Sequence, residues 1–129
     1  MPVLALTTDS SGLTALGNDY GFEKVFERQV EAFAKRGDVV LGITTSGNSA
    51  NVLKGLALAK KKGCRTLAFS GIDFGKGAKD GGKLARAPYV DLCLSVAGAR
   101  GSHIQEAHIA MGHALCFIVE SELKRRGKI

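Results

Sequence analysis

The fold is decided by the stretch Asp38-Val39-Val40-Leu41-Gly42-Ile43, which runs directly into Thr44-Thr45-Ser46-Gly47-Asn48-Ser49. The first half is short, apolar and rich in β-branched residues, which is typical of a strand buried on both faces. The second half is a hydroxyl-rich turn, and apolar residues then recur at helical spacing over residues 51–62. A strand that passes through a short turn into a helix indicates the α/β class.

Outward from this stretch, helical and strand-like segments alternate along the chain. Residues 2–6 form a further short apolar run before the first polar turn. Helices are predicted at 22–34, 51–62 and 103–124, strands at 38–43, 65–70 and 89–94, and glycine-rich loops at 71–82 and 97–102. The alternation predicts one domain, residues 1–129, with a mostly parallel sheet covered by helices on both faces.

Composition narrows the class of protein. The chain has 129 residues, of which 45% are hydrophobic, and its apolar runs are shorter than a membrane span requires. Three widely spaced cysteines without a Cys-x-x-Cys pair indicate neither a disulfide framework nor a thiolate zinc site. No secretory leader is recognisable, so we expect a cytoplasmic protein that binds no membrane.

The formal charge of +6 is concentrated at residues 60–62 and 124–128. Such clusters attract nucleic acid or anionic substrates, but basic residues are also favoured in the last turn of a helix. The second interpretation is preferred, because no aromatic residues are interleaved with the charges as single-strand binding would require. We expect no nucleic-acid partner.

The hydroxyl turn (residues 44–49) is a candidate phosphate site. It follows the carboxyl end of a strand, where ligands of open α/β folds bind, and it enters a helix whose first N–H groups lack partners. Gly47 lets the backbone approach a ligand closely. Hydroxyl donors are supplied by Thr44, Thr45, Ser46 and Ser49. The alternative is an ordinary helix N-cap, although a cap needs only one hydroxyl.

Gln105 and His113 are candidate functional residues of the final helix. They are eight positions apart, which at ~100° per residue leaves both able to face one site, with Glu106 and His108 nearby. The helix is apolar around much of its circumference, so it is expected to be largely buried. A histidine there serves as an acid, a base or a metal ligand, or it forms a hydrogen bond within the core.

Several motifs in order along the chain resemble those of the phosphoheptose isomerases, in the sugar isomerase (SIS) superfamily. They are Thr7-Thr8-Asp9, Gly17-Asn18-Asp19-Tyr20-Gly21, the hydroxyl turn, Asp80-Gly81-Gly82-Lys83 and Ile104-Gln105-Glu106-x-His108. The resemblance implies a three-layer α/β/α, Rossmann-like SIS domain. It also implies conversion of sedoheptulose 7-phosphate to D-glycero-D-manno-heptose 7-phosphate, a step towards ADP-heptose for bacterial surface polysaccharides.

The resemblance also implies roles for individual residues. The phosphate would be held by Thr44, Thr45, Ser46 and Ser49, and the sugar by Asn18 and Asp19. Gln105 would contact substrate and zinc, and His113 would act as a zinc ligand or as an acid or base. Relatives of this kind are homotetramers with sites at subunit interfaces, so the same assembly is expected here.

The chain departs from the family pattern at its beginning. Family members have N-terminal helices, a central first strand, a Gly-Asn-Gly-Gly-Ser-type loop, and a helix carrying a His and the Glu base. None of these is found in the 129 residues, and Met1 falls where the family's second strand begins. We therefore expect an N-terminally truncated domain whose first strand and helices are missing, and which is a poor isomerase alone.

The alternative is a non-catalytic phosphosugar-binding module of the same superfamily. One such relative associates with the bacterial replication initiator, and it lacks the matching histidine and has an altered turn. His113 and an intact hydroxyl turn are both present here, which favours the isomerase.

Overall fold

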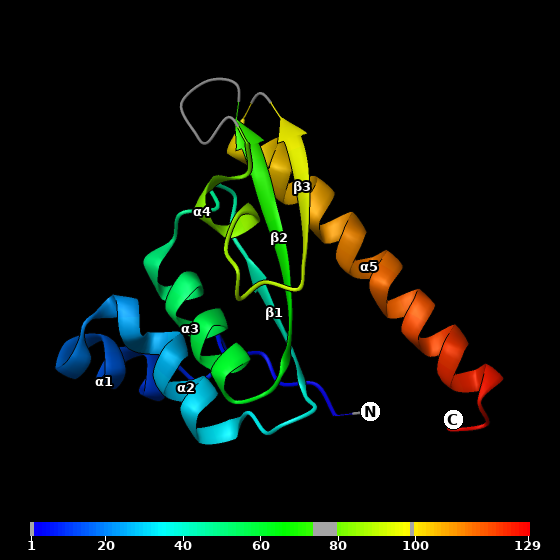
Figure 1. Cartoon of the computed structure of the whole chain (residues 1–129), viewed down its shortest axis with the longest axis horizontal. Coiled ribbons are helices and arrows are strands. Elements are labelled where there is room, and N and C mark those ends of the chain that lie inside the picture. The colour runs from blue at the N-terminus through cyan, green and yellow to red at the C-terminus, as the bar shows by residue number, and fades with distance from the viewer. Residues whose placement is uncertain (1, 74–79, 99) are drawn as a thin grey trace.

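Three parallel strands lie between two layers of helices (Figure 1). The computed structural model describes residues 2–73, 80–98 and 100–129. Its elements are α1 (Ser10–Tyr20), η1 (Phe22–Lys24), α2 (Val25–Phe33), β1 (Val39–Ile43), α3 (Ala50–Lys61), β2 (Arg65–Asp73), α4 (Gly82–Ala85), β3 (Leu92–Gly98) and α5 (Gly101–Arg125). Residues 74–79 and 99, which belong to the two predicted loops, lie outside the described residues.

The sheet has the order β1-β2-β3, and both pairs of strands are parallel. Helix α3 covers one face, where Leu56 packs with Ala68 of β2 and Leu84 of α4. Helix α5 lies on the other face (Figure 1). The three-layer α/β/α architecture expected from the sequence is therefore confirmed. At Gly42, a Cβ would lie 2.7 Å from the side chains of Leu56 and Val52, so glycine allows α3 to pack tightly on β1.

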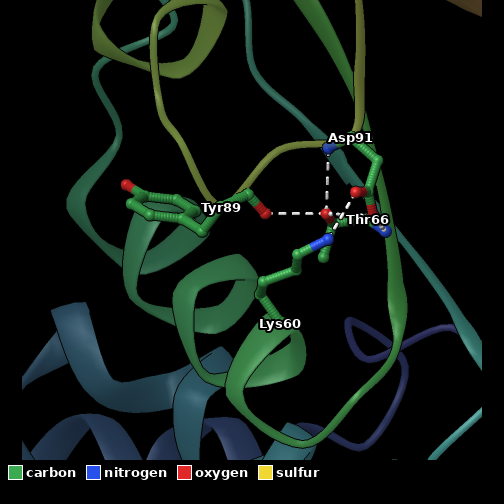
Figure 2. A network of polar contacts seen from close by, with 4 residues as sticks. All are labelled: Lys60, Thr66, Tyr89 and Asp91. Carbon is green, nitrogen blue, oxygen red and sulfur yellow. Dashed lines mark hydrogen bonds and ion pairs between the residues drawn. The ribbon is translucent and has the colours of Figure 1, made fainter.

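The third strand begins and ends later than predicted, at Leu92–Gly98 instead of 89–94. Figure 2 shows the reason, because the residues before it are tied to β2 by side chains. The hydroxyl of the fully buried Thr66 donates to the carbonyl oxygen of Tyr89 at 2.7 Å. The Asp91 carboxylate accepts from the Thr66 backbone N–H at 2.9 Å and also contacts Lys60. The apolar pattern could not reveal these bonds.

Helix α5 is far less buried than the sequence suggested, and that expectation was wrong. Only Ile104 and His108 are buried in it, whereas Phe117 is 71% exposed and Ile118 61% exposed. Its second half runs away from the sheet (Figure 1). Apolar residues occur on several sides of this helix, and one three-stranded sheet can cover only one of them.

The N-terminal apolar run does not form the strand that the family resemblance placed near Met1. Residues 2–5 have no regular structure, and Val3 and Leu4 are exposed. A strand needs a neighbouring strand to pair its backbone groups. Among the described residues, β1 is at one edge of the sheet and pairs only with β2.

Candidate functional site

The hydroxyl turn leaves the carboxyl end of β1 and gathers its side chains into one cluster. The Thr44 N–H donates to the Phe69 carbonyl at 3.0 Å, which extends the ladder between β1 and β2 by one residue. Thr44 is buried, and its hydroxyl oxygen lies 2.8 Å from that of Ser49 and 3.4 Å from that of Ser46. Three hydroxyl groups are thus collected where the strand becomes a helix.

The geometry does not favour an ordinary helix cap. Ser49 is the N-cap of α3, but its side chain accepts no capping hydrogen bond. Its hydroxyl contacts Thr44 instead, and the Ser46 hydroxyl accepts from the Asn48 N–H at 3.2 Å. Each hydroxyl has one donor hydrogen, so three hydroxyls joined by two contacts leave one donor for a ligand. The positive end of the α3 dipole favours an anion at the same place.

Gly47 shapes the turn through a conformation that suits glycine. Its φ is +66°, and a Cβ there would lie 1.9 Å from the carbonyl oxygen of Gly81. The Leu84 N–H donates to the Gly47 carbonyl at 2.9 Å, and the Lys83 N–H donates to the Asn48 side chain at 3.1 Å. Residues 81–84 therefore brace the hydroxyl turn from outside. We call them the bracing segment.

A cavity of about 650 Å³ opens beside the turn, between the end of β1 and the first half of α5. It is lined by Ile43, Thr44, Thr45, Ser49, Gln105, His108, Ile109 and Gly112. The structure thus brings Gln105 to the hydroxyl turn, although the two are far apart in sequence. Hydroxyl, amide and imidazole groups facing one cavity can bind a ligand that carries both a phosphate and hydroxyl groups.

The other sequence-derived candidates lie elsewhere within one chain. His113 is exposed and is not among the residues that line the cavity. Asn18 and Asp19 are exposed in the last turn of α1, where the Asn18 amide donates to the Asp19 carboxylate at 2.8 Å. Helix α1 packs with α2, far from the end of β1 that bears the turn (Figure 1).

The residues present do not by themselves fit a zinc ion. Within residues 2–73, 80–98 and 100–129, no three His, Cys, Asp or Glu side chains are close enough to share a metal. Gln105 and His113 are two candidate donors, whereas protein zinc sites use three or four protein ligands.

Sequence reasoning missed Ser70, and it named His108 without assigning it a place beside the site. Ser70 is fully buried in the second half of β2, and its hydroxyl donates to the Gly81 carbonyl at 2.7 Å. His108 is buried on α5 and contacts the Ser70 carbonyl. His108 follows the fully buried Ile104 by four residues, and that i, i+4 spacing was the available signal that both face the sheet.

A second cavity, of about 230 Å³, lies between the sheet and the middle of α5. Its lining is apolar and includes Leu67, Leu92, Leu94, Met111 and Leu115. It offers no charged or hydroxyl group to a phosphate.

No helix in the described ranges is both long and apolar enough to cross a membrane.

Comparisons with known proteins show the family of the chain. Residues 1–71 match the model of the SIS domain family. The chain is 51% identical over 123 residues to the phosphoheptose isomerase of Geobacter sulfurreducens, covering 95% of this chain and 60% of the relative. It is 52% identical over 127 residues to the phosphoheptose isomerase of Aquifex aeolicus, covering 98% of this chain and 61% of that relative.

Solved structures give the same result. The phosphoheptose isomerase of Neisseria gonorrhoeae superposes with a TM-score of 0.81 at 45% identity, over 90% of this chain and 61% of that one. Because the family model matches more than half of its residues, the chain belongs to the SIS domain family. The relatives described above are phosphoheptose isomerases, and the chain spans about 60% of the length of each.

Proposed function

We propose that the chain is the phosphosugar-binding part of an isomerase that interconverts sedoheptulose 7-phosphate and D-glycero-D-manno-heptose 7-phosphate. The observation that carries the proposal is the joint lining of one cavity by Thr44, Ser49 and Gln105. A phosphate group fits the hydroxyls and the α3 N-terminus, and the polyhydroxyl chain of the sugar then extends towards the Gln105 amide.

The phosphate would anchor the substrate, and binding energy gained there would orient the reacting carbons. Thr44, Thr45, Ser46 and Ser49 supply the hydroxyl contacts in this proposal. A ligand oxyanion would replace the contacts that the hydroxyls make with one another, at 2.8 and 3.4 Å from Thr44. Charge-assisted hydrogen bonds of this kind are about twice as strong as neutral ones.

The reaction moves one proton between C1 and C2 of the sugar. A base removes a proton from C1 of the ketose while an acid protonates the C2 carbonyl oxygen, which gives an ene-diol. The C1 hydroxyl then loses its proton as C2 gains one, which gives the aldose. We assign His113 to acid–base work, or to zinc ligation with Gln105. His113 is outside the cavity of its own chain, so this role requires a site shared between subunits.

A homotetramer would supply that shared site. Ile109, Phe117 and Ile118 of α5 are each at least 61% exposed, which is an apolar surface suited to another subunit. Asn18 and Asp19, which lie away from the cavity of their own chain, would contact the sugar only across such an interface. Zinc, if it binds at Gln105 and His113, needs further ligands from beyond the described residues.

The second candidate is a phosphosugar-binding module without isomerase activity. It is favoured by one observation, that His113 is not among the residues that line the cavity of its own chain. Both candidates share the phosphate site, so binding and turnover must be measured separately.

Calorimetric titration of the chain with sedoheptulose 7-phosphate tests the shared site. We expect binding, with inorganic phosphate as a weaker competitor. No heat of binding at millimolar ligand would contradict both candidates. NMR of the same mixture then follows the conversion to the aldose. We expect little turnover by this chain alone, and full turnover would exclude the binding-module candidate.

A further inference from the structure

His108 connects the final helix to the second half of β2 beside the site cavity. It is only 4% exposed, and its Nε2 lies 2.9 Å from the carbonyl oxygen of Ser70. A carbonyl oxygen can only accept, so Nε2 carries the hydrogen and donates it. The ring also packs on Phe69, with centroids 5.8 Å apart. Within the described residues, the other ring nitrogen, Nδ1, is buried and has no hydrogen-bond partner.

Ser70 extends this connection towards the hydroxyl turn. While its carbonyl accepts from His108, its hydroxyl donates to the Gly81 carbonyl at 2.7 Å. Ser70 is fully buried, so water does not compete for either bond. The Gly81 oxygen in turn fills the space beside Gly47, where a Cβ would lie 1.9 Å from it. A shift of Ser70 would therefore displace the Gly81 carbonyl from the turn.

The bracing segment completes the chain of contacts. Its Leu84 N–H donates to the Gly47 carbonyl at 2.9 Å, and its Lys83 N–H to the Asn48 side chain at 3.1 Å. The backbone of the hydroxyl turn is thus held by a segment that Ser70 itself holds. The start of that chain is the Nε2–H of His108.

We propose that His108 is a positioning residue of the phosphate site, acting through Ser70 and Gly81 on the hydroxyl turn. The proposal rests on the phosphate-binding function proposed above. The same bond also fixes the face of α5 that carries Gln105 relative to the second half of β2. One imidazole therefore sets the spacing between the two walls of the cavity.

The competing interpretation is a histidine that only fills the core. A packed ring would be replaced by phenylalanine with little effect on phosphate affinity, because the contact with Phe69 would be kept. A positioning residue needs the donor at the Nε2 position, and the amide nitrogen of glutamine can reach nearly the same place. His108→Phe and His108→Gln therefore separate the two interpretations.

The experiment titrates the 129-residue chain with sedoheptulose 7-phosphate and with inorganic phosphate, and follows the Gly47 and Gly81 amides by NMR. We expect H108F to weaken binding about ten-fold and to shift both amide signals, because one buried hydrogen bond is lost. H108Q should stay within about three-fold of wild type. Ser70→Ala, which removes the bond to Gly81 but leaves α5 untouched, should weaken binding about as much as H108F.

Val30→Ala is the control for general destabilisation, because Val30 is buried in the separate cluster with Ala59 and Cys64. It should lower the melting temperature and leave phosphate affinity unchanged. Wild-type affinity in both H108F and S70A would overturn the inference, and so would equal losses in V30A and H108F. If H108F does not fold, the phosphate affinities of S70A and H108Q test the inference instead. Absence of phosphate binding by the wild type would refute the proposed function itself. If Thr44→Val loses phosphate affinity while H108F and S70A keep it, only the role of His108 is refuted.

Discussion

The carbonyl oxygen of Gly81 stands where a side chain of Gly47 would otherwise be, because a Cβ built on Gly47 lies 1.9 Å from that oxygen. The relationship is reciprocal, since the bracing segment takes its position from the turn that it supports. Gly82, next along the chain, would place a Cβ 2.5 Å from the Ser46 carbonyl. Two backbone segments thus meet with no side chain between them.

Gly47→Ala should therefore abolish phosphate binding and lower the free energy of unfolding by about 3 kcal/mol, from steric overlap and the positive φ together. Gly37→Ala is the matched control. Gly37 also has a positive φ, +93°, but no atom lies within 4 Å of a Cβ there. Gly37→Ala should lower the free energy of unfolding by only about 1 kcal/mol and leave phosphate affinity unchanged. Chemical unfolding and calorimetry measure both quantities, and equal effects of the two variants would contradict the close approach.

Thr44→Val should reduce affinity for sedoheptulose 7-phosphate by about ten-fold or more, because it removes one hydroxyl while nearly keeping the side-chain shape. The loss of affinity should be larger than the loss caused by removing a surface hydroxyl. Thr14→Val provides the comparison, since the Thr14 hydroxyl donates to the Ser10 carbonyl within α1, away from the cavity. If T44V binds sedoheptulose 7-phosphate as tightly as T14V does, Thr44 is not part of the site.

The acid stability of the protein should depend on Asp91. Its pKa is lowered from 3.8 to about 2, first by the hydrogen bond from Lys60 and then by the Thr66 backbone N–H. A carboxyl group with a lowered pKa in the folded state contributes stability above its unfolded pKa. That contribution is lost as pH falls through the folded value. The relevant window is thus between pH 3.8 and about 2.

Asp91→Asn should be less stable than wild type at neutral pH, and the urea midpoints of the two proteins should converge across that window. Lys60→Met removes the main cause of the shift. It should move the Asp91 carboxyl titration, followed by carbon-13 NMR, back towards the ordinary value. Parallel midpoints for D91N and wild type down to pH 2 would be inconsistent with this role for Asp91.

Phe117→Ser should shift the protein towards monomer without reducing its helix content, because Phe117 is 71% exposed and makes up part of the apolar surface of α5. Sedimentation velocity measures the change. Lys124→Ser on the same helix is the control, because Lys124 forms only an exposed ion pair with Glu120. A wild-type chain that stays monomeric at high concentration would contradict the proposed tetramer.

The sequence predicted the elements well where one periodicity dominated. The β-branched run of β1 and the apolar stripe of α3 were placed within a residue or two, since each has one consistent set of buried neighbours. The start of β3 was misplaced, because Thr66 and Asp91 hold the preceding residues by side-chain bonds that hydropathy does not register. The burial of α5 was overestimated, because its apolar residues occur on several sides and the three-stranded sheet covers only one of them.

The site was predicted in part. The hydroxyl turn was recognisable because its donors are adjacent in sequence and follow a strand. The motif Asp80-Gly81-Gly82-Lys83 was noted, but the support that the bracing segment and Ser70 give to the turn was not. That support comes from backbone groups and one hydroxyl in distant parts of the chain. Those contacts depend on how β2 lies beside β1, which no local pattern encodes.

The meeting of Gly47 and Gly81 has a consequence for protein engineering. The hydroxyl turn is not a portable module, since its backbone shape is supplied from more than thirty residues downstream. A graft of residues 44–49 into another α/β scaffold should fail to bind phosphate. A graft that also transfers residues 80–84, with a serine at the position of Ser70 in the adjacent strand, should succeed. Recombination between distant homologues should be viable only when both segments come from the same parent.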